Sequence, residues 1–352
     1  MTDPPLCNVV ERCGGCPWLL LTESEEHQHK MTQVQDLIAN LGLTNVGLEF
    51  VTTGERTGYR NRIRLRIDEQ GAIGYFNTGK ALDCAVLQPA LRAFVSRLRD
   101  WASTNPLQLA SFAHVEARTC DADGHWGLFL TYRADAHEHA SFTAQLASDM
   151  GPVLVATNRD GCVPQQRFAH HKGGFLFIPL NGFVQINPAV NHRLVEHVAH
   201  GALTHHWSTF VDLYGGAGNF AVPLARAGLS GSLIERSRDC IQAASRSVRA
   251  QKLLGLQMQA ADAITASRSL LASGAAHDVV IIDPPRAGIQ HGLDVVLALA
   301  KRAIVYCSCN LATLERDVRV LMNAGWTVQR LAGFDMFPGT RHLETVAWLV
   351  PR

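Results

Sequence analysis

The sequence predicts an α/β protein, with a doubly wound, Rossmann-like sheet over residues 181–352 and a smaller, β-rich α+β domain over residues 1–180. From about residue 185, apolar β-branched runs alternate with helical stretches, which is typical of a doubly wound sheet. Between about residues 50 and 180, short β-like runs are separated by Gly, Asn and Asp, which favours a small sheet-rich domain. The length of 352 residues also favours two domains over one.

The C-terminal half contains a series of candidate strands. They are residues 209–213, 231–235, 256–262, 278–283, 303–308, 326–331 and 345–350. Ligands of doubly wound sheets bind beyond the carboxyl ends of the strands, so the residues that follow these runs are the first candidates for a site. In the N-terminal half, residues 22–43 are expected to form a helix that begins after Ser24, ends at Gly42 and could pack on the C-terminal domain. Its apolar face is expected to consist of Met31, Val34, Leu37, Ile38 and Leu41.

With 47% hydrophobic and 18% charged residues, the composition is that of an ordinary soluble globular protein. The first residues lack the basic and apolar segments of a signal peptide, and no run approaches the roughly 18 apolar residues that span a bilayer. We therefore expect a cytoplasmic protein without a membrane partner. The net charge is only +1, so binding to a polyanion would depend on local patches rather than on overall charge.

A glycine-rich segment follows the first candidate strand. Residues 212–219 read Asp-Leu-Tyr-Gly-Gly-Ala-Gly-Asn, and glycines at such a turn let the backbone approach a ligand closely. Glu235 ends the second strand, where a carboxylate can accept both ribose hydroxyls, and Asp262 ends the third, where it could meet an adenine. This acidic set favours S-adenosylmethionine. Residues 216–221 also fit a loose dinucleotide pattern, so a nicotinamide-dependent oxidoreductase and a purely structural turn are the alternatives.

Three further residues at strand ends carry reactive groups. Asp283 precedes two prolines, which cannot continue a sheet ladder and therefore fix the carboxylate at the sheet edge. Cys309 lies at the exit of the fifth strand, where a thiolate could attack an electron-poor carbon, and Glu344 leads into the last strand and could act as a general base. Simpler explanations exist, because Asp-Pro starts many turns, strand cysteines are usually buried and a single glutamate is usually solvated. For Cys307 we favour burial.

Together these groups suit the methylation of a carbon that cannot attack a methyl donor unaided. Uracil C5 is such a carbon. Addition of a thiolate at C6 makes C5 nucleophilic, C5 then takes the methyl group, and a base removes the C5 proton so that the thiol can leave. Cys309, Asp283 and Glu344 fit the nucleophile, the group that holds the edge of the base and the proton acceptor.

The same motifs, in this order, resemble those of the RNA uracil-5 methyltransferase family. They are residues 183–187 (Phe-Val-Gln-Ile-Asn), 212–219, 283–286 (Asp-Pro-Pro-Arg), 308–310 (Ser-Cys-Asn) and 342–344 (His-Leu-Glu). The resemblance implies a class I methyltransferase fold that uses S-adenosylmethionine to make 5-methyluridine in RNA, with Cys309 as nucleophile and Glu344 as base. It also implies a pocket for the cofactor and the target base, lined by Gln185, Tyr214, Asn219, Glu235, Asp262 and Asp283.

Two residues depart from the usual pattern of that family. Gly215 stands where cysteine is usual, which we expect to be harmless, and Leu311 stands where proline commonly follows Ser-Cys-Asn, which we expect to loosen the nucleophile loop. Among the alternatives, an oxidoreductase would leave Asp283 and Cys309 without a role. A metal-cluster RNA-binding protein with an inactive methyltransferase domain would not need a complete set of acid, thiol and base. A cytosine-C5 methyltransferase would be expected to have a Pro-Cys nucleophile loop, which this sequence does not show.

Three of the nine cysteines lie within ten residues near the N-terminus. Cys7, Cys13 and Cys16 need a fourth ligand to hold zinc or an iron–sulfur cluster, and spacing alone does not choose the metal. Cys84 is the best candidate for that ligand. The less suited candidates are Cys120 and Cys162. The family resemblance implies a [4Fe–4S] cluster on the four cysteines 7, 13, 16 and 84, with a structural or RNA-positioning role.

Further features of the N-terminal half concern the RNA partner. Arg60, Arg62, Arg64 and Arg66 alternate with mostly apolar residues, so in a strand they would share one face and suit phosphate contacts, although a solvated face would look the same. A target uracil would have to leave its stack to reach Cys309. Within the resembled family, a cysteine cluster so near the start leaves no room for an N-terminal RNA-binding β-barrel. This favours 23S ribosomal RNA as substrate for a monomeric enzyme, with transfer RNA as the alternative.

Overall fold

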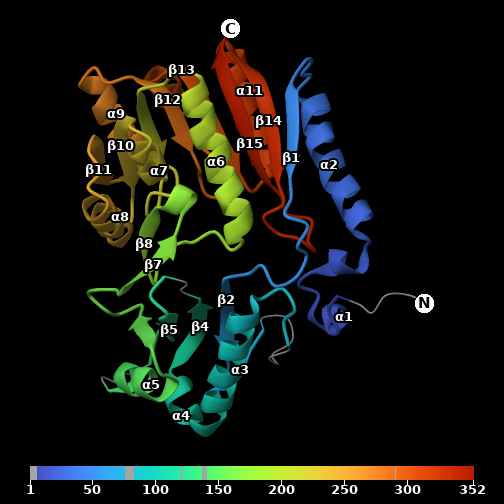
Figure 1. The fold of residues 1–352 in the computed structure, drawn as a ribbon, viewed down its shortest axis with the longest axis vertical. Coiled ribbons are helices and arrows are strands. Elements are labelled where there is room, and N and C mark those ends of the chain that lie inside the picture. Colours follow the sequence, from blue (N-terminus) through green and yellow to red (C-terminus); the bar gives the residue numbers. More distant parts are fainter. Residues whose placement is uncertain (1–5, 76–82, 120–121, 137–140, 290) are drawn as a thin grey trace.

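The computed structural model describes residues 6–75, 83–119, 122–136, 141–289 and 291–352. An eight-stranded sheet dominates the C-terminal half and a five-stranded sheet the N-terminal half (Figure 1). A two-stranded hairpin lies between them in sequence. Within the described ranges, no helix is long and apolar enough to cross a bilayer.

The eight-stranded sheet has the order β1-β14-β15-β13-β12-β9-β10-β11, and only β15 runs antiparallel to its neighbours. Its strands are β1 (Gly47–Val51), β9 (Thr209–Leu213), β10 (Ser230–Glu235), β11 (Leu256–Ala260), β12 (His277–Ile282), β13 (Ala300–Ser308), β14 (Trp326–Phe334) and β15 (Glu344–Pro351). The seven strands predicted from the sequence are therefore confirmed, and their ends shift by at most three residues.

Both faces of the central strands are apolar, which is why helices cover the sheet on two sides. In β12, Val279 and Ile281 belong to one hydrophobic cluster, whereas Val280 and Ile282 belong to the other, as the alternation of a strand requires. The first cluster contains residues of α6 (Pro188–Thr204), α7 (Ala221–Arg226) and α8 (Arg238–Ala250). The second contains residues of α2 (Glu23–Asn40), α9 (Ala263–Ala272), α10 (Leu293–Leu299) and α11 (Leu311–Asn323).

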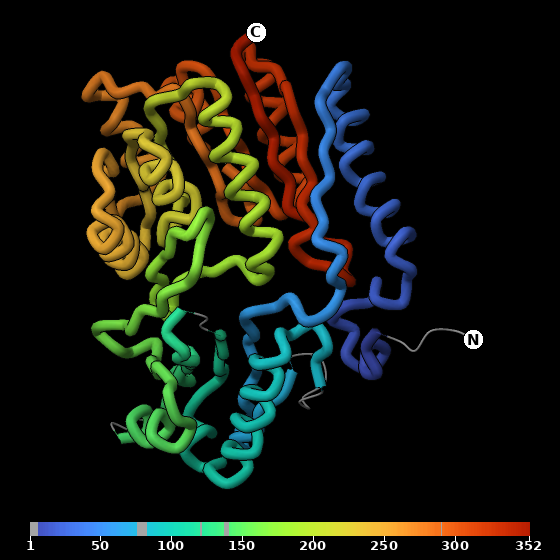
Figure 2. Tube along the Cα trace, viewed as in Figure 1, coloured from blue at the N-terminus to red at the C-terminus, as the bar shows by residue number. Residues whose placement is uncertain are grey.

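Residues 22–51 pack with the eight-stranded sheet rather than with the five-stranded one. The helix α2 begins after Thr22, which forms a capping box with Glu25, and packs on the sheet through Val34 and Leu37. The strand β1 then pairs in parallel with β14, and Figure 2 shows both blue elements beside the red strands. The expected division at residue 181 stays a prediction, but it does not separate the two sheets, because β1 comes from the N-terminal side.

The five-stranded sheet has the order β3-β2-β4-β5-β6 and packs one face on α3 (Pro89–Thr104) and α5 (Phe142–Met150). Its strands are β2 (Arg62–Ile67), β3 (Ile73–Gly74), β4 (Phe112–Arg118), β5 (Trp126–Tyr132) and β6 (Val153–Thr157). The short helices of this half are α1 (Val10–Cys13), η1 (Pro17–Leu20) and α4 (Pro106–Leu109). This mixture agrees with the β-rich α+β architecture expected from the sequence.

The hairpin joins the two halves. It consists of β7 (Gln165–Ala169) and β8 (Phe175–Pro179), with η2 (His171–Gly173) between them. The backbone N–H of Phe177 donates to Ser247 Oγ of α8 at 2.8 Å, so the hairpin is held on the C-terminal domain. It thereby brings residues 168–171 to the carboxyl edge of the large sheet, where they line a pocket.

Candidate active site

The glycine-rich loop links β9 to α7 at the carboxyl edge of the large sheet. Gly216 and Gly218 have φ angles of 56° and 96°, and Tyr214, which enters the loop, has a φ of 62°. A Cβ atom on Gly218 would lie 2.7 Å from Val222 Cγ2, so this turn requires glycine both for its conformation and for its packing. The glycines of this loop are therefore explained by its conformation and packing, and the close approach of its backbone to a ligand stays a prediction.

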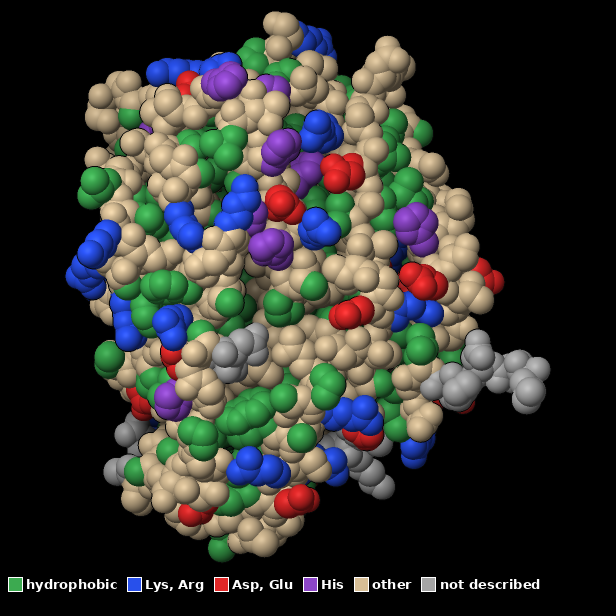
Figure 3. All heavy atoms as spheres, viewed as in Figure 1, with side chains coloured by type: hydrophobic (Ala, Val, Ile, Leu, Met, Phe, Trp, Pro, Cys, Tyr) green, Lys and Arg blue, Asp and Glu red, His purple; other side chains and the backbone are tan. Residues whose placement is uncertain are grey.

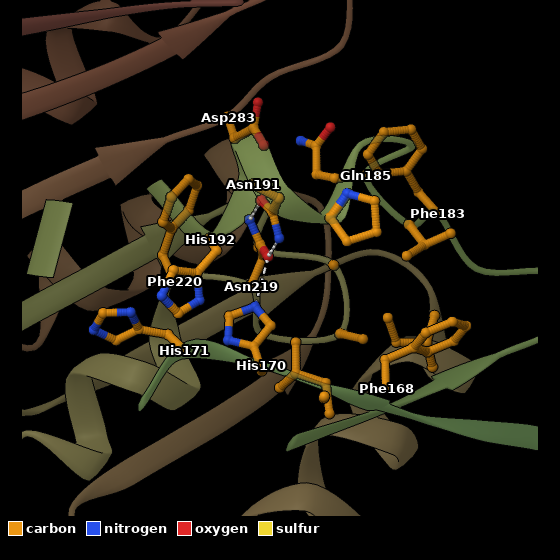
Figure 4. Close-up of a pocket in the computed structure, with 18 of the residues that line it drawn as sticks. Phe168, His170, His171, Phe183, Gln185, Asn191, His192, Asn219, Phe220 and Asp283 are labelled. Carbon is orange, nitrogen blue, oxygen red and sulfur yellow. Dashed lines mark hydrogen bonds between the residues drawn. The ribbon is translucent and has the colours of Figure 1, made fainter. Parts of the chain in front are cut away.

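A pocket that is open to solvent lies beside this loop, and we call it the cofactor pocket. Four residues predicted for the cofactor and the target base line it: Gln185, Tyr214, Asn219 and Asp283. Figure 4 shows Asp283, Gln185 and Asn219 around this pocket, with Asn219 below the other two in that view.

Two other residues were predicted for this pocket. Glu235 and Asp262 lie beside the loop and outside the lining of the cofactor pocket. Glu235 accepts a hydrogen bond from the backbone N–H of Gly216 at 3.1 Å, so its carboxylate supports the loop directly. Asp262 caps α9 by accepting from the backbone N–H of Thr265 at 3.0 Å, and these hydrogen bonds hold its pKa below the usual range. Its charge also adds to burial in raising the pKa of Tyr214, so both acids lie near the pocket.

A chain of hydrogen-bonded side chains forms one wall of the cofactor pocket, and no local sequence pattern indicates it. Asn219 Oδ1 accepts from Asn191 Nδ2 at 2.9 Å and lies 2.9 Å from His170 Nε2. Burial lowers the pKa of His170 to about 4, so the imidazole is neutral and its Nε2–H donates to the amide oxygen. The wall therefore fixes the orientation of Asn219 (Figure 4).

Three carboxyl groups gather where β9, β12 and β15 meet the site. Asp212 is fully buried and accepts a hydrogen bond from the backbone N–H of Ala221 at 3.0 Å. Burial raises the pKa of Asp283 to about 7. Burial and the neighbouring Asp283 raise the pKa values of Asp212 and Glu344 well above the usual range. Because carboxylates this close disfavour one another's ionisation, the group tends to retain protons at neutral pH.

Cys309 lines a second, polar pocket on the other side of the Asp283–Arg286 turn, which we call the nucleophile pocket. Its lining consists of Gln33, Arg286, Cys309, Asn310, Leu311, Ala312, Arg341, His342 and Leu343. Glu344 follows this lining directly in the chain and is only 4% exposed at the start of β15. Cys307 is instead fully buried in the sheet, as expected for a core residue.

Charged neighbours of both signs act on the Cys309 thiol. Burial raises its pKa above the usual value, and the Glu344 charge adds to this effect. Arg286 opposes it, because its guanidinium forms a hydrogen bond with the thiol and lowers the pKa. The last residue of the Asp-Pro-Pro-Arg motif is therefore a member of the site, although sequence patterns gave it no role.

The two departures from the family pattern are explained by packing and capping. A Cβ atom on Gly215 would lie 2.2 Å from Leu233 Cδ1, so Leu233 fills the space that a cysteine side chain would need. Leu311 is the first residue of α11, and the loop before it is held by Asn310, whose Nδ2 donates to the Arg286 carbonyl at 3.0 Å. The loosening expected from the missing proline is opposed by this bond.

The cysteines predicted as metal ligands lie around one small cavity. They are Cys7, Cys13, Cys16 and Cys84. Burial and, to a lesser extent, the other three thiols raise the pKa of Cys16 to about 11, although Arg60 opposes this shift. Cys162 is exposed, and Cys120 lies outside the described residues.

The fit of this cavity to a metal differs between one ion and a cluster. In the described part of the chain, no group of three or more His, Cys, Asp or Glu side chains is arranged to hold a single metal ion. A lone zinc with bonds of about 2.3 Å would need its four sulfurs close together, whereas a four-iron cluster holds them further apart. The remaining lining is mostly apolar, and it includes Val10, Leu19 and Val86. The donor set itself fits either metal, because thiolates bind both zinc and iron–sulfur clusters.

The predicted four-arginine face is present in part. Arg62, Arg64 and Arg66 lie on one face of β2, and the opposite face packs in the core through Ile63, Leu65 and Ile67. Arg62 lies over the ring of the exposed Phe183, 5.3 Å from its centroid. The prediction was wrong for Arg60, which does not belong to this face. It precedes the strand, forms a β-bridge with Leu87 and lies near the Cys16 thiol. Figure 3 shows lysine and arginine side chains spread over the viewed face rather than gathered in one patch.

Known proteins resemble this chain in sequence. Residues 175–352 match the family model described as tRNA (Uracil-5-)-methyltransferase. The chain is 26% identical over 367 residues to the 23S rRNA (uracil(1939)-C(5))-methyltransferase RlmD of Vibrio cholerae, which covers 99% of this chain and 82% of that protein. It is 29% identical over 363 residues to the RlmD of Aeromonas hydrophila, with 97% and 81% covered.

A solved structure shares the fold along nearly the whole chain. It is the tRNA (uracil-54, C5)-methyltransferase of Pyrococcus abyssi in complex with S-adenosyl-L-homocysteine. The TM-score is 0.72 at 22% identity, with 99% of this chain and 88% of that chain covered. The likeness confirms the predicted class I methyltransferase fold, and none of these matches supports an oxidoreductase.

Proposed function

Because the chain belongs to the tRNA (uracil-5-)-methyltransferase family, and is thus a methyltransferase, we propose that it methylates uracil C5 in 23S ribosomal RNA. The observation that carries this proposal is the position of the Asp283–Arg286 turn between two pockets. Asp283 faces the cofactor pocket, whereas Arg286 and Cys309 line the nucleophile pocket. A uracil held at this turn would have its C5 toward the methyl donor and its C6 toward the thiol.

The residues at the turn account for each step of the reaction. S-adenosylmethionine supplies an electrophilic methyl group. Cys309 Sγ, as the thiolate, bonds to C6, and the electron pair of the C5–C6 double bond makes C5 nucleophilic. C5 then bonds to the methyl carbon, whose bond to the sulfonium sulfur breaks. Glu344 takes the C5 proton, the double bond re-forms and the Cys309 thiolate leaves. Glu344 must be ionised to take this proton, and because burial raises its pKa, the ionised form then binds the proton strongly.

The cofactor and the target base would be held by the residues around the cofactor pocket. We infer that Gln185, Tyr214, Asn219 and Glu235 hold S-adenosylmethionine, with Asp262 near its adenine. Asp283 has a pKa of about 7 and can share a proton with a polar edge of the uracil, which orients C6 toward the thiol.

The substrate is tested by product analysis. The full chain is incubated with S-adenosylmethionine and either unmodified 23S ribosomal RNA or unmodified transfer RNA, and 5-methyluridine is quantified by mass spectrometry. We expect at least a tenfold preference for ribosomal RNA, because the relatives described above are named as 23S rRNA methyltransferases. A preference for transfer RNA would contradict the choice of substrate, and the absence of 5-methyluridine from both RNAs would contradict uracil methylation itself.

Replacing Arg286 by methionine is expected to shift the pH dependence of thiol addition. Arg286 lowers the pKa of Cys309, so its loss leaves less thiolate at any pH below that pKa. The rate of covalent complex formation with RNA that contains 5-fluorouracil should fall about tenfold at pH 7.5 and recover as the pH rises. Arg286→Lys keeps the charge and is the matched control. A uniform fall of the methionine variant at all pH values would contradict this electrostatic role.

We also propose that Cys7, Cys13, Cys16 and Cys84 hold a [4Fe–4S] cluster, each thiolate binding one iron. The protein purified without oxygen should contain iron and acid-labile sulfide in equal amounts. Replacing Cys84 by serine should remove most of both, whereas replacing the exposed Cys162 by serine should not. Zinc in place of iron and sulfide would contradict the cluster.

A further inference from the structure

The loop of residues 335–343 lies between the four-cysteine cavity and the nucleophile pocket. On the side of the cavity, the carbonyl of Gly339 accepts a hydrogen bond from the backbone N–H of Trp18 at 2.9 Å. A Cβ atom on Gly339 would lie 2.7 Å from Leu19 Cγ and 3.4 Å from Cys16 Cβ, so the loop packs directly on the cysteine segment. On its other side, residues 341–343 line the nucleophile pocket, and Glu344 follows them.

A buried lysine of α2 holds this loop. Lys30 is 0% exposed, and its Nζ donates to Asp335 Oδ1 at 2.6 Å and to the carbonyl of Phe337 at 3.3 Å. Its third partner is Glu26 Oε1 at 2.7 Å. The same carboxylate oxygen accepts from the backbone N–H of Gly339 at 2.6 Å. Lys30 and Glu26 therefore fix both the first part and the middle of the loop.

The positive and negative charges of this network balance. Arg56 pairs with Glu26 Oε2 through Nε at 2.8 Å and also binds the carbonyls of Leu21 and Trp18. Two cations thus face two carboxylates, Glu26 and Asp335. The loss of one member of such a buried set leaves an uncompensated charge, which the remaining groups can relieve only by moving or by admitting water.

The helix that carries Lys30 also forms part of the nucleophile pocket. Gln33 lies three residues later on the same face of α2 and lines the pocket with Cys309. The loop and the helix therefore form two walls of one pocket. The Lys30 ammonium connects them through its hydrogen bonds to Asp335 and Phe337.

We propose that Lys30 is a positioning residue of this enzyme: it holds loop 335–343 on α2 so that His342 and Glu344 keep their places beside Cys309. Lys30 does not touch the reacting atoms. This inference rests on the proposed function, because the geometry that Lys30 maintains is that of the nucleophile and its base.

The test compares the Lys30→Met variant of the full chain with the wild-type protein, per folded molecule and well below both melting temperatures. The rate of covalent complex formation with RNA that contains 5-fluorouracil, at saturating S-adenosylmethionine, should fall about 100-fold, as expected for a displacement of about 1 Å at a reacting group. The dissociation constant for S-adenosylmethionine should change less than about threefold. Hydrogen exchange of the amides in residues 335–343 should become at least tenfold faster. Lys30→Arg should restore part of the rate, and Asp335→Asn provides a milder variant if Lys30→Met does not fold.

The control is Asp278→Ala, at the opposite edge of the sheet, where Asp278 accepts from the backbone N–H groups of Ser208 and Thr209. This variant should lose stability without losing rate. If Lys30→Met and Asp335→Asn lower the melting temperature as the control does but keep the wild-type rate and exchange pattern, the positioning role is overturned. If the wild-type protein forms no complex with RNA, the proposed function fails instead. In that case, hydrogen exchange and the alkylation rate of Cys309 still decide whether Lys30 holds the loop.

Discussion

Replacing Cys309 by alanine is expected to lower methyl transfer at least 10⁴-fold and to abolish the covalent complex with RNA that contains 5-fluorouracil, in the presence of S-adenosylmethionine. Without the thiol, no group of the described site can add to C6, so C5 stays too weak a nucleophile to take the methyl group. The measurement is the amount of protein–RNA complex that survives denaturing electrophoresis, together with the rate of 5-methyluridine formation.

The matched control is Cys307→Ala, two residues earlier in the same strand. Cys307 is fully buried in the core, so its replacement should cost about 1–2 kcal/mol of stability through lost packing and leave covalent trapping intact. If Cys309→Ala still traps RNA, the assignment of the nucleophile is wrong, and Cys307 becomes the next candidate.

Replacing Glu344 by glutamine is expected to stop the reaction one step later. Thiol addition and methyl transfer do not need the Glu344 carboxylate, but removal of the C5 proton does. The variant should therefore accumulate a methylated covalent complex on ordinary uracil RNA, with no fluorine present, while turnover falls about 10³-fold. A methyl-labelled cofactor makes this complex visible after denaturing electrophoresis.

A glutamate on the outer face of α11 provides the control for this variant. Glu315 pairs with Arg319 on the surface, so Glu315→Gln should turn over like the wild-type protein and accumulate nothing. Normal turnover of Glu344→Gln would show that another group removes the proton. Loss of the covalent complex would instead place Glu344 before methyl transfer.

The elements that could be predicted from the sequence are those with a strong local pattern. The strands around Asp212, Asp283 and Cys309 follow from apolar β-branched runs, and the loop before Asn219 follows from its glycines. The pairing of β1 with β14 could not be predicted in this way, because residues 47–51 meet residues 330–334 only through tertiary structure.

The same reason explains the side chains of the site that the sequence did not indicate. Lys30 meets Asp335 across 305 residues, and His170 meets Asn219 across 49 residues, so neither pair leaves a mark in local spacing. Arg286 was visible as part of a motif, but its contact with the Cys309 thiol depends on how two sheet-edge loops approach one another. Cys84 is the exception, because three clustered cysteines predict a fourth one nearby, and Cys84 lines the same cavity as they do.

The central claim is that Cys309 bonds to C6 of a uracil that then receives a methyl group at C5. It is tested most directly by isolating the complex formed with S-adenosylmethionine and RNA that contains 5-fluorouracil, digesting it and identifying the modified peptide by mass spectrometry. Fluorine at C5 cannot be removed as a proton, so the complex should persist after methyl transfer. The predicted result is a peptide in which Cys309 carries a uridine bearing both fluorine and a methyl group. A nucleotide on Cys307, or an adduct without the methyl group, would contradict the account.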